Sequence, residues 1–254
     1  MKSWRLLRLE TQDDSFLKMA KEEAIMDALR AGQVPATLRF YAWSKPAVAI
    51  GYFQEVDKEL DLSRCRADGV ELFRRLTGGG AVYKFPTYEL NYSFIIHEDD
   101  LRVPKDIEAS YKLICGAVMK GLARLGFVTT FKPINDILLD GKKISGNAQT
   151  RVDNVLLQHG TILLRPDIKK MFTYLKIDDE KLREKKVAHV SDLVTGLCET
   201  RQVSQVEVQD AITEGFRDVF GEEFEEAANL TPAELARAKD LYSKYAGDEW
   251  NLWR

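Results

Sequence analysis

Three consecutive glycines, Gly78 to Gly80, follow two arginines, Arg74 and Arg75, and precede a strand-like segment, residues 81–83. Because glycine has no Cβ, a phosphate or carboxyl group of a ligand can lie directly against the backbone N–H groups of such a loop. The arginines supply fixed positive charge for an anion held there. The stretch therefore predicts either an anion-binding loop or a glycine-rich hairpin turn with two solvated arginines, and the rest of the chain has to decide.

The glycine loop differs from the two common phosphate-binding motifs. A Walker A loop continues into a lysine followed by serine or threonine, whereas here the glycines are followed by Ala81, Val82 and Tyr83. A dinucleotide-binding fingerprint opens a helix, and no helical pattern follows this loop. We expect a different arrangement, in which a strand, the glycines and a second strand wrap a bent phosphate group.

The overall composition is that of an ordinary globular protein. Of the 254 residues, 45% are hydrophobic and 30% are charged, and the formal net charge of −3 gives no signature of nucleic-acid binding. Three cysteines, Cys65, Cys115 and Cys198, lie far apart without a CxxC pair. This spacing argues against a zinc site or a disulfide framework and favours a reducing compartment. Since there is no signal-peptide pattern and no apolar run of about 18 residues, we expect a cytoplasmic protein that binds neither membrane nor nucleic acid.

Hydrophobic periodicity predicts an α+β fold in one domain spanning residues 1–254, with a helical C-terminal part from about residue 204. Residues 105–125 have the clearest amphipathic helical pattern, which makes Cys115 a core residue. Strands at residues 70–73, 81–83 and 90–96 are expected to form a meander around the glycines. The other expected strands are residues 4–9, 38–41, 47–51 and 155–164, and the other expected helices begin near Asp14, Leu62, Asp167, Ser204 and Thr231.

A second dense stretch of polar residues lies between apolar strands further along the chain. Asp140 and Gly141 are a strong hairpin signal, and Lys143 follows in the next strand. A lysine in that place can direct its ammonium at a ligand oxygen, or it can be an ordinary surface lysine beside a turn. Asp136 can form a turn, hold a phosphate-bound metal or pair with the lysine ammonium. His159, within an apolar strand, is expected to be a hydrogen-bonded core residue.

Taken together, these segments resemble the lipoate–protein ligase family, which belongs to a superfamily with biotin–protein ligases and octanoyltransferases. The motifs are, in order, Arg74-Arg75-x-Thr-Gly-Gly-Gly-Ala-Val-Tyr, Asn135-Asp136, Lys142-Lys143-Ile-Ser-Gly-Asn-Ala-Gln and His159-Gly-Thr. Each motif is weak alone, but the ordered set is highly specific and covers nearly the whole chain. The resemblance implies mixed, largely antiparallel β-sheets flanked by helices, as in the catalytic domains of biotin ligases and class II aminoacyl-tRNA synthetases.

The family's chemistry implies an ATP-dependent lipoate–protein ligase. ATP first converts lipoate to lipoyl-AMP, and a specific lysine of a lipoyl-carrier protein then attacks this mixed anhydride and displaces AMP. By resemblance, Lys143 would be the catalytic residue that bridges the acyl carboxyl and the α-phosphate, and Asp136 would bind Mg²⁺. The residues implied in binding ATP and lipoate are Arg74, Arg75, Gly78, Gly79, Gly80, Ala81, Val82, Tyr83, Asn135, Asp136, Lys143, Ser145, Gly146, Ala148 and His159.

The resemblance also implies partners. The acceptor would be an E2 domain, a glycine-cleavage H protein or another lipoate-binding protein, and any charge complementarity with an acidic carrier would lie in the basic run at residues 181–186. Larger family members carry a C-terminal accessory domain, whereas this sequence stops shortly after Glu249-Trp250-Asn251. We therefore expect a short form, for which a separate small accessory protein is a hypothesis.

One departure and two alternatives stay open. After the glycines and Tyr83, family members usually continue with His-Asp, whereas this chain has Lys84 and Phe85, so that Lys84 is a candidate to contribute charge instead. An octanoyltransferase or lipoyl amidotransferase of the same fold would carry the acyl group on a cysteine thiolate without ATP, and residues 131–135 before the hairpin contain no cysteine. The second alternative is a non-catalytic lipoate-binding protein, which would bind the ligand at this site but would not transfer an acyl group.

Overall fold

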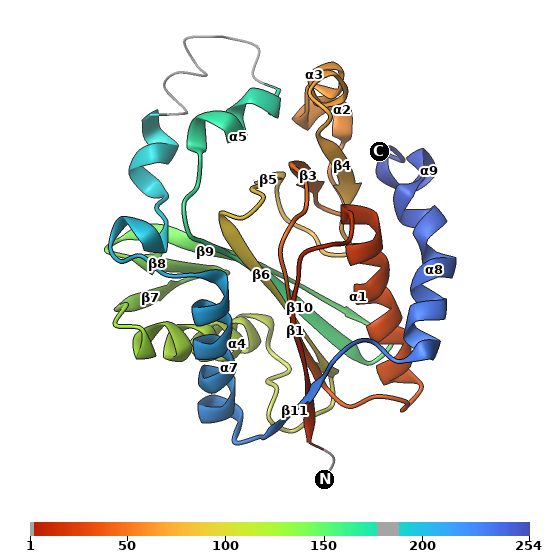
Figure 1. Ribbon diagram of the computed structural model, residues 1–254, viewed down its shortest axis with the longest axis vertical. Helices are drawn as coiled ribbons and strands as arrows, with labels where there is room; N and C mark the ends of the chain where they lie inside the picture. The colour runs from red at the N-terminus through yellow and green to blue at the C-terminus, as the bar shows by residue number, and fades with distance from the viewer. Residues whose placement is uncertain (1–2, 177–187) are drawn as a thin grey trace.

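The computed structural model describes residues 3–176 and 188–254. Within these ranges the strands form two sheets, and Figure 1 shows helices on both sides of the larger sheet. In spatial order, the larger sheet contains β11 (Phe224–Ala227), β1 (Trp4–Glu10), β2 (Thr37–Tyr41), β6 (Glu89–His97), β10 (Val155–Leu163), β9 (Lys142–Val152), β8 (Asp136–Leu139) and β7 (Thr129–Lys132). The smaller sheet contains β4 (Glu71–Arg74), β3 (Ala47–Ile50) and β5 (Val82–Lys84).

Strand pairing in the larger sheet is mostly antiparallel. The exceptions are at one end of the sheet, where β1 pairs in parallel with both β11 and β2. From β2 to β7 every neighbouring pair is antiparallel. The prediction of an α+β fold with mixed, largely antiparallel sheets is confirmed. The strand β11 itself was not expected, so the part of the chain after residue 204 is not helical throughout.

The predicted meander around the glycines is wrong. Strands β4 and β5 do not pair with each other but lie on either side of β3, and β6 belongs to the other sheet. The apolar strand β3 is buried along its whole length, and it hydrogen-bonds to β4 in parallel and to β5 in antiparallel orientation. The glycine loop therefore connects two strands that are not neighbours and has to pass over the end of β3.

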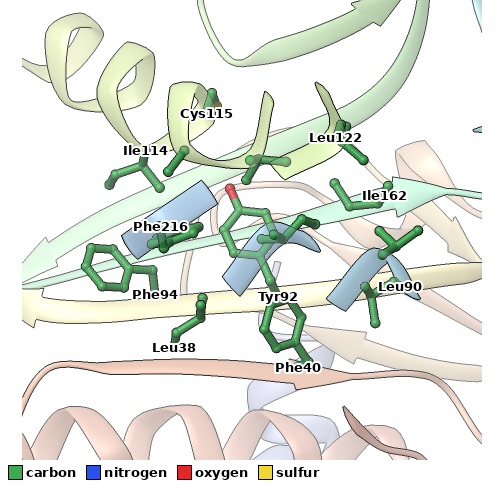
Figure 2. Close-up of a cluster of buried hydrophobic side chains, with 14 of the residues drawn as sticks. Leu38, Phe40, Leu90, Tyr92, Phe94, Ile114, Cys115, Leu122, Ile162 and Phe216 are labelled. Carbon is green, nitrogen blue, oxygen red and sulfur yellow. The ribbon is translucent and has the colours of Figure 1, made fainter. Parts of the chain in front are cut away.

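Two helices cover each face of the larger sheet (Figure 1). The helices α4 and α7 lie against one face, and α1 and α8 lie against the other. Figure 2 shows Tyr92 and Phe94 of β6 beside Phe216 of α7, with Ile114 and Cys115 of α4 in the same cluster. The α-helices with bounds wholly inside the described ranges are α1 (Ser15–Arg30), α2 (Val56–Glu59), α3 (Leu62–Ala67), α4 (Ile107–Arg124), α5 (Ile168–Tyr174), α7 (Gln205–Phe220), α8 (Pro232–Ala246) and α9 (Asp248–Asn251), and residues 188–193 are helical as well.

The helix ends follow the capping residues of the sequence. Asp14 accepts a hydrogen bond from the Leu17 backbone N–H at the start of α1, and capping boxes begin α7 at Ser204 and α8 at Thr231. Gly221 ends α7 in the left-handed conformation, with φ of 66°. None of the helices in the described ranges combines the length and the apolar character that are needed to cross a membrane.

Candidate functional site

A cavity of about 340 Å³ is lined by residues of both sheets, of α1 and of the glycine loop. One part of its wall is apolar and includes side chains of Met19, Trp43 and Phe73. Another part carries the cationic side chains of Arg75 and Lys143. The combination suits a ligand with an apolar chain at one end and an anionic or strongly polar group at the other.

Most of the predicted site residues meet at this cavity. Those in its wall are Arg75, Gly79, Gly80, Ala81, Val82, Tyr83, Asn135, Lys143, Gly146, Ala148 and His159. Those outside the described lining are Arg74, Gly78, Asp136 and Ser145. The two segments that contain these residues meet at β10, where Thr77 of the glycine loop hydrogen-bonds to His159 and Lys84 of β5 donates to Thr161, contacts that are remote in the sequence.

The Arg75 guanidinium is buried beside the cavity and organises the glycine loop. Its Nη2 donates hydrogen bonds of 2.9 Å to the carbonyl oxygens of Gly78 and of Gly80, and its Nε donates to Thr77 Oγ1 at 3.1 Å. Within the described ranges no carboxylate lies at ion-pair distance from it, and burial lowers the pKa of Arg75 to about 10. The side chain remains charged at neutral pH, so this buried cation favours an anionic or polar ligand group.

Arg74 makes structural contacts and lies outside the described cavity lining, so its ligand contact stays a prediction. Its guanidinium donates hydrogen bonds to backbone carbonyl oxygens, among them those of Gly51 and Gln54 at 3.0 and 2.9 Å. It also donates to the carbonyl oxygens of Trp250 and Asn251. Arg74 thus ties the C-terminal segment to the loop that follows β3.

Gly51 explains how closely the glycine loop approaches β3. A Cβ on Gly51 would lie 2.0 Å from the carbonyl oxygen of Gly79, so only glycine lets the two backbones meet. Gly79 itself has φ of 99°, a conformation that other residues rarely adopt. The loop is therefore held between the end of β3 and the Arg75 side chain, and it is not a free hairpin turn.

The hairpin of β8 and β9 presents Lys143 to the cavity. The Lys143 ammonium lies 2.6 Å from Asp136 Oδ1, so of the roles considered for Asp136 the structure shows the pairing with lysine. A Cβ on Gly146 would lie 2.9 Å from Lys143 Nζ, which means that this glycine makes room for the lysine itself. The neighbouring Lys142 is exposed, as expected from the alternation of a strand.

Asp136 has little support as a metal ligand in this arrangement. Across the described residues, no group of three or more His, Cys, Asp or Glu side chains is placed to hold a metal ion. The carboxylate already faces the Lys143 ammonium. A magnesium ion at Asp136 stays a prediction, and no chemical step is derived through it.

His159 lines the cavity and makes two hydrogen bonds through its ring. Nε2 lies 2.8 Å from Thr77 Oγ1, and Nδ1 lies 3.1 Å from Oε2 of Glu22 on α1. The expectation of a hydrogen-bonded core histidine agrees with this geometry. Glu22 and Thr77 were not predicted as part of the site. The signal that could have found Glu22 is a glutamate on the buried face of an amphipathic helix.

Lys84 also lines the cavity, at the position where the sequence departs from the family that it resembles. Its ammonium donates to Thr161 Oγ1 at 2.6 Å and to Asn91 Oδ1 at 3.1 Å, and it lies 3.4 Å from Glu89 Oε1. Burial lowers the pKa of the Lys84 ammonium. The charge that we expected Lys84 to contribute is thus largely balanced by Glu89, which lies behind the lining residues.

The three cysteines, all in the described part of the chain, lie away from the cavity. Cys65, Cys115 and Cys198 are buried, and none of them belongs to the cavity wall. Burial raises the pKa of Cys65 to about 11 and that of Cys115 to about 12. Such thiols are poor nucleophiles at neutral pH because the thiolate is the reactive form.

The fold and the cavity define a catalytic domain of the type found in lipoate ligases. The bi-partite lipoate protein ligase of Thermoplasma acidophilum superposes with a TM-score of 0.90 at 32% identity, covering 99% of this chain and 97% of that one. A lipoate-protein ligase A bound with ATP superposes with a TM-score of 0.85 at 30% identity, covering 99% of both chains.

The chain belongs to the family of the lipoyl protein ligase A/B catalytic domain, whose model matches residues 14–217. Among curated relatives, the octanoyltransferase LipM of Clostridioides difficile (strain 630) is 34% identical over 275 residues, which cover 100% of both proteins. LipM of Moorella thermoacetica is 35% identical over 269 residues, which cover 98% of this chain and 97% of the relative.

These relatives overturn the prediction of an ATP-dependent lipoate–protein ligase. They match the chain over its whole length and carry the name of an octanoyltransferase, the alternative that the sequence left open. The coarser expectation, an enzyme of the lipoylation family, is confirmed. The basic run at residues 181–186, which was considered for carrier recognition, lies outside the described residues.

Proposed function

We propose that this protein transfers an octanoyl group from a thioester donor to a lysine of a lipoyl-carrier protein. The observation that carries the proposal is the cavity in which an apolar wall meets Arg75 and Lys143. The full-length similarity to octanoyltransferases supports the same activity. The acceptor class is supported by the Thermoplasma ligase, which was described together with its E2 lipoyl domain.

The apolar wall suits a saturated acyl chain. Met19, Tyr41, Trp43, Ala49 and Phe73 contribute it, and Trp43 stacks on Phe73 with ring centroids 5.0 Å apart. Burying each methylene group of an acyl chain in such a pocket contributes about 0.8 kcal/mol. The chain would supply most of the binding energy and bring the carbonyl group towards the cationic wall.

The cationic wall suits the reacting carbonyl group. The neutral amine of the acceptor lysine attacks the thioester carbon and forms a C–N bond, and negative charge develops on the carbonyl oxygen. Lys143 would stabilise that charge, whereas Arg75 would hold the polar end of the donor already in the bound ground state. The C–S bond then breaks, the amine loses a proton, and the donor leaves as a thiol, which leaves an amide on the acceptor lysine.

The cysteine positions favour direct transfer between donor and acceptor. A covalent acyl-enzyme needs a nucleophile within reach of the bound carbonyl. Cys65 and Cys115 lie in the cores that α3 and α4 form, and Cys198 is buried near Leu164. We therefore write the reaction without a thioester on this chain, unlike the cysteine-dependent route considered from the sequence.

ATP and Mg²⁺ are not part of this reaction. Among solved relatives, one lipoate-protein ligase was determined bound with ATP, and a putative lipoate protein ligase of T. acidophilum was determined with bound lipoic acid. Thioester donors are already activated, so the transfer proposed here uses no nucleotide. Lipoate and a separate accessory protein remain predictions, and both belong in the experiment that tests the activity.

The test is a three-arm transfer assay with an apo E2 lipoyl domain as acceptor, read by intact mass. The first arm contains octanoyl–acyl carrier protein alone, the second octanoate with ATP and Mg²⁺, and the third lipoate with ATP and Mg²⁺. We expect acylation in the first arm. Acylation confined to the two arms with ATP would overturn the proposal. An acceptor whose target lysine is replaced by arginine controls for modification elsewhere.

A further inference from the structure

We propose that Glu22, which lies outside the cavity wall, is a positioning residue of this site that acts through His159 to hold Arg75 in its binding orientation. Glu22 belongs to α1, whereas Arg75 follows β4, more than fifty residues further along the chain. A chain of three hydrogen bonds connects them. Through this connection Glu22, which does not line the cavity, would control the orientation of the Arg75 guanidinium, which does.

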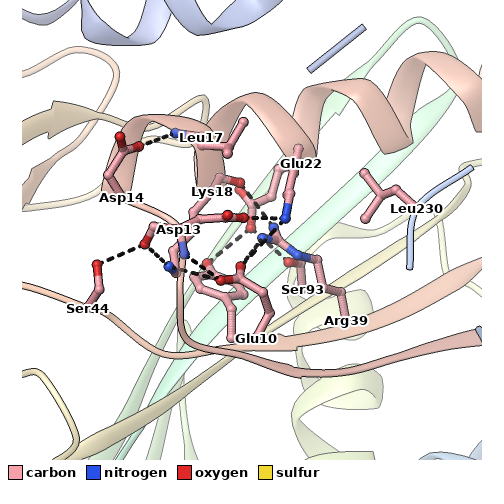
Figure 3. A network of polar contacts seen from close by, with 12 residues as sticks. Glu10, Asp13, Asp14, Leu17, Lys18, Glu22, Arg39, Ser44, Ser93 and Leu230 are labelled. Atoms are coloured by element: carbon pink, nitrogen blue, oxygen red, sulfur yellow. Dashed lines mark hydrogen bonds and ion pairs between the residues drawn. The ribbon is translucent and has the colours of Figure 1, made fainter. Parts of the chain in front are cut away.

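The hydrogen bonds run from the carboxylate to the guanidinium without a gap. Glu22 Oε2 lies 3.1 Å from His159 Nδ1, His159 Nε2 lies 2.8 Å from Thr77 Oγ1, and Thr77 Oγ1 accepts from Arg75 Nε at 3.1 Å. Figure 3 shows Glu22 within the polar network beneath α1, close to Ser93. Its Oε1 accepts from Ser93 Oγ at 2.8 Å and from the Tyr41 hydroxyl at 3.1 Å, so the carboxylate is held on several sides.

One arrangement satisfies every donor and acceptor of this chain. Arg75 Nε–H can only donate, so Thr77 Oγ1 accepts from it and has its own hydroxyl proton left to donate. In this arrangement the hydroxyl donates to the lone pair of His159 Nε2. The ring proton then sits on Nδ1 and is donated to the Glu22 carboxylate, which stabilises this tautomer.

His159 is therefore engaged at both nitrogens and is not free to take a proton from an acceptor lysine. The same chain explains how Arg75 keeps one orientation without an adjacent carboxylate. With Nε held by Thr77, its Nη2 meets the carbonyl oxygens of Gly78 and Gly80. Glu22 thus helps to set the shape of the glycine loop before the ligand binds, which lowers the cost of ordering the site on binding.

Glu22 is tied more directly to His159 than to a nearby cation. Against the effect of burial, the charges of His159 and of Arg39 lower the pKa of Glu22. The Arg39 Nη1, however, donates to the Lys18 carbonyl oxygen at 3.0 Å, and its Nη2 lies 3.5 Å from Glu10. Among the ion pairs of the described chain, Glu22 pairs only with His159. The histidine ring is therefore the group that this buried carboxylate is placed to orient.

The tautomer of His159 can be measured directly. The chain has three histidines, so nitrogen-15 NMR of the imidazole rings, assigned with His159→Gln, reports which ring nitrogen carries the proton. At pH 8 we expect the Nδ1–H form in the wild type and a shift towards the Nε2–H form in Glu22→Gln. A wild-type His159 that carries its proton on Nε2 would overturn the inference.

Kinetics test the consequence for binding. We expect Glu22→Gln and Thr77→Val to raise KM for octanoyl–acyl carrier protein by about tenfold and to change kcat by less than about threefold. Thr77→Ser, which keeps the hydroxyl, should restore KM. Glu234→Gln is the matched control, since Glu234 of α8 is equally buried but pairs with Arg5 of β1, and neither residue lines the cavity.

The outcomes separate this inference from the proposed function, on which only the kinetic readout rests. If the wild type transfers no octanoyl group, the proposed function fails, and the His159 tautomer still decides the inference. If transfer occurs and the KM of Thr77→Val equals that of the wild type, the positioning role is refuted. An equal rise of KM in Glu234→Gln would likewise refute it, because loss of stability would then explain the effect.

Discussion

The Lys143 ammonium nitrogen lies 2.6 Å from Asp136 Oδ1, across the hairpin that joins β8 to β9. The two side chains are 38% and 22% exposed, so water screens the pair and it contributes only about 0.5 kcal/mol to stability. The main effect of the pair is to orient the Lys143 ammonium, because Asp136 keeps it beside the backbone of Gly146. The pair therefore bears on activity more than on folding.

Replacing the lysine tests its role in the transfer. We expect Lys143→Met to lower kcat by about 100-fold, because an aimed donor that stabilises a developing oxyanion typically contributes that much. The measurement is the rate of octanoyl transfer to the lipoyl domain at saturating donor. Lys142→Met is the control, since Lys142 points to solvent and should keep the wild-type rate. A kcat for Lys143→Met within about threefold of the wild type would contradict the assignment.

Gly146→Ala should displace the lysine without unfolding the sheet. The new Cβ would meet Lys143 Nζ and Cε at 2.9 Å, and the flexible end of that side chain can move away. We expect the rate of transfer to fall while the melting temperature stays near that of the wild type. Gly116→Ala is the comparison, because nothing lies within 4 Å of its Cβ and alanine in the helix α4 should add about 0.5 kcal/mol of stability. Unchanged transfer by Gly146→Ala would show that the position of the ammonium is unimportant.

Replacement by lysine should have different effects at the adjacent Arg74 and Arg75. Arg75→Lys loses the planar fork that holds Thr77 and the loop carbonyl groups, and we expect weaker donor binding, seen as a KM raised by about tenfold. Arg74→Lys should instead lower the free energy of unfolding by about 3 kcal/mol, since buried carbonyl groups of the C-terminal segment lose their donors. Urea denaturation measures the unfolding free energy of both variants, and steady-state kinetics measures their KM. A raised KM for Arg74→Lys together with a lowered unfolding free energy for Arg75→Lys would contradict the two assigned roles.

The buried pair of Arg5 and Glu234 predicts part of the acid sensitivity. Burial alone would raise the pKa of the Glu234 carboxyl, but the hydrogen bonds from Arg5 and from Thr231 outweigh it and the net pKa is lowered. A carboxyl whose pKa is lower in the folded state adds stability above its unfolded value of 4.5, and this stability is lost as the pH falls through the folded value.

We therefore expect Glu234→Gln to lose about 3 kcal/mol of unfolding free energy at pH 7, where a buried guanidinium is left without its counter-ion. The difference from the wild type should shrink as the pH drops below 4.5, where the carboxyl of the unfolded wild type becomes protonated, and it should be lost once the pH has fallen through the lower folded pKa. Chemical denaturation at a series of pH values measures this. A difference that stays constant down to pH 3 would contradict the lowered pKa.

Local features of the fold were accessible from the sequence because short-range geometry determines them. The Asp140-Gly141 turn has positive φ at both residues, 49° and 76°, as a two-residue hairpin requires. The capping boxes at Ser204 and Thr231 begin their helices where the side chain can meet the free N–H groups of the first turn. Such contacts span three or four residues and do not depend on the rest of the chain.

The pairing of the small sheet was not accessible in the same way. Consecutive strands around a glycine loop favour a meander, but β3, which comes earlier in the chain, lies between β4 and β5. Which strands pair depends on burying the two-sided apolar strand Ala47–Ile50, and that requires partners on both edges. For the same reason the last strand, β11, was missed, because its pairing with β1 is remote in the sequence.

The sequence by itself determined most of the elements, the caps of the main helices and the motifs that identify the family, including the glycine loop, Lys143 and His159. Only the tertiary structure separated Arg75, which faces the cavity, from Arg74, which holds the C-terminal segment, although the two are adjacent. It also brought Glu22 to His159 and left all three cysteines outside the cavity. The physical reason is that neighbouring residues of a strand point to opposite faces, and what each face meets is decided by packing between segments far apart in the chain.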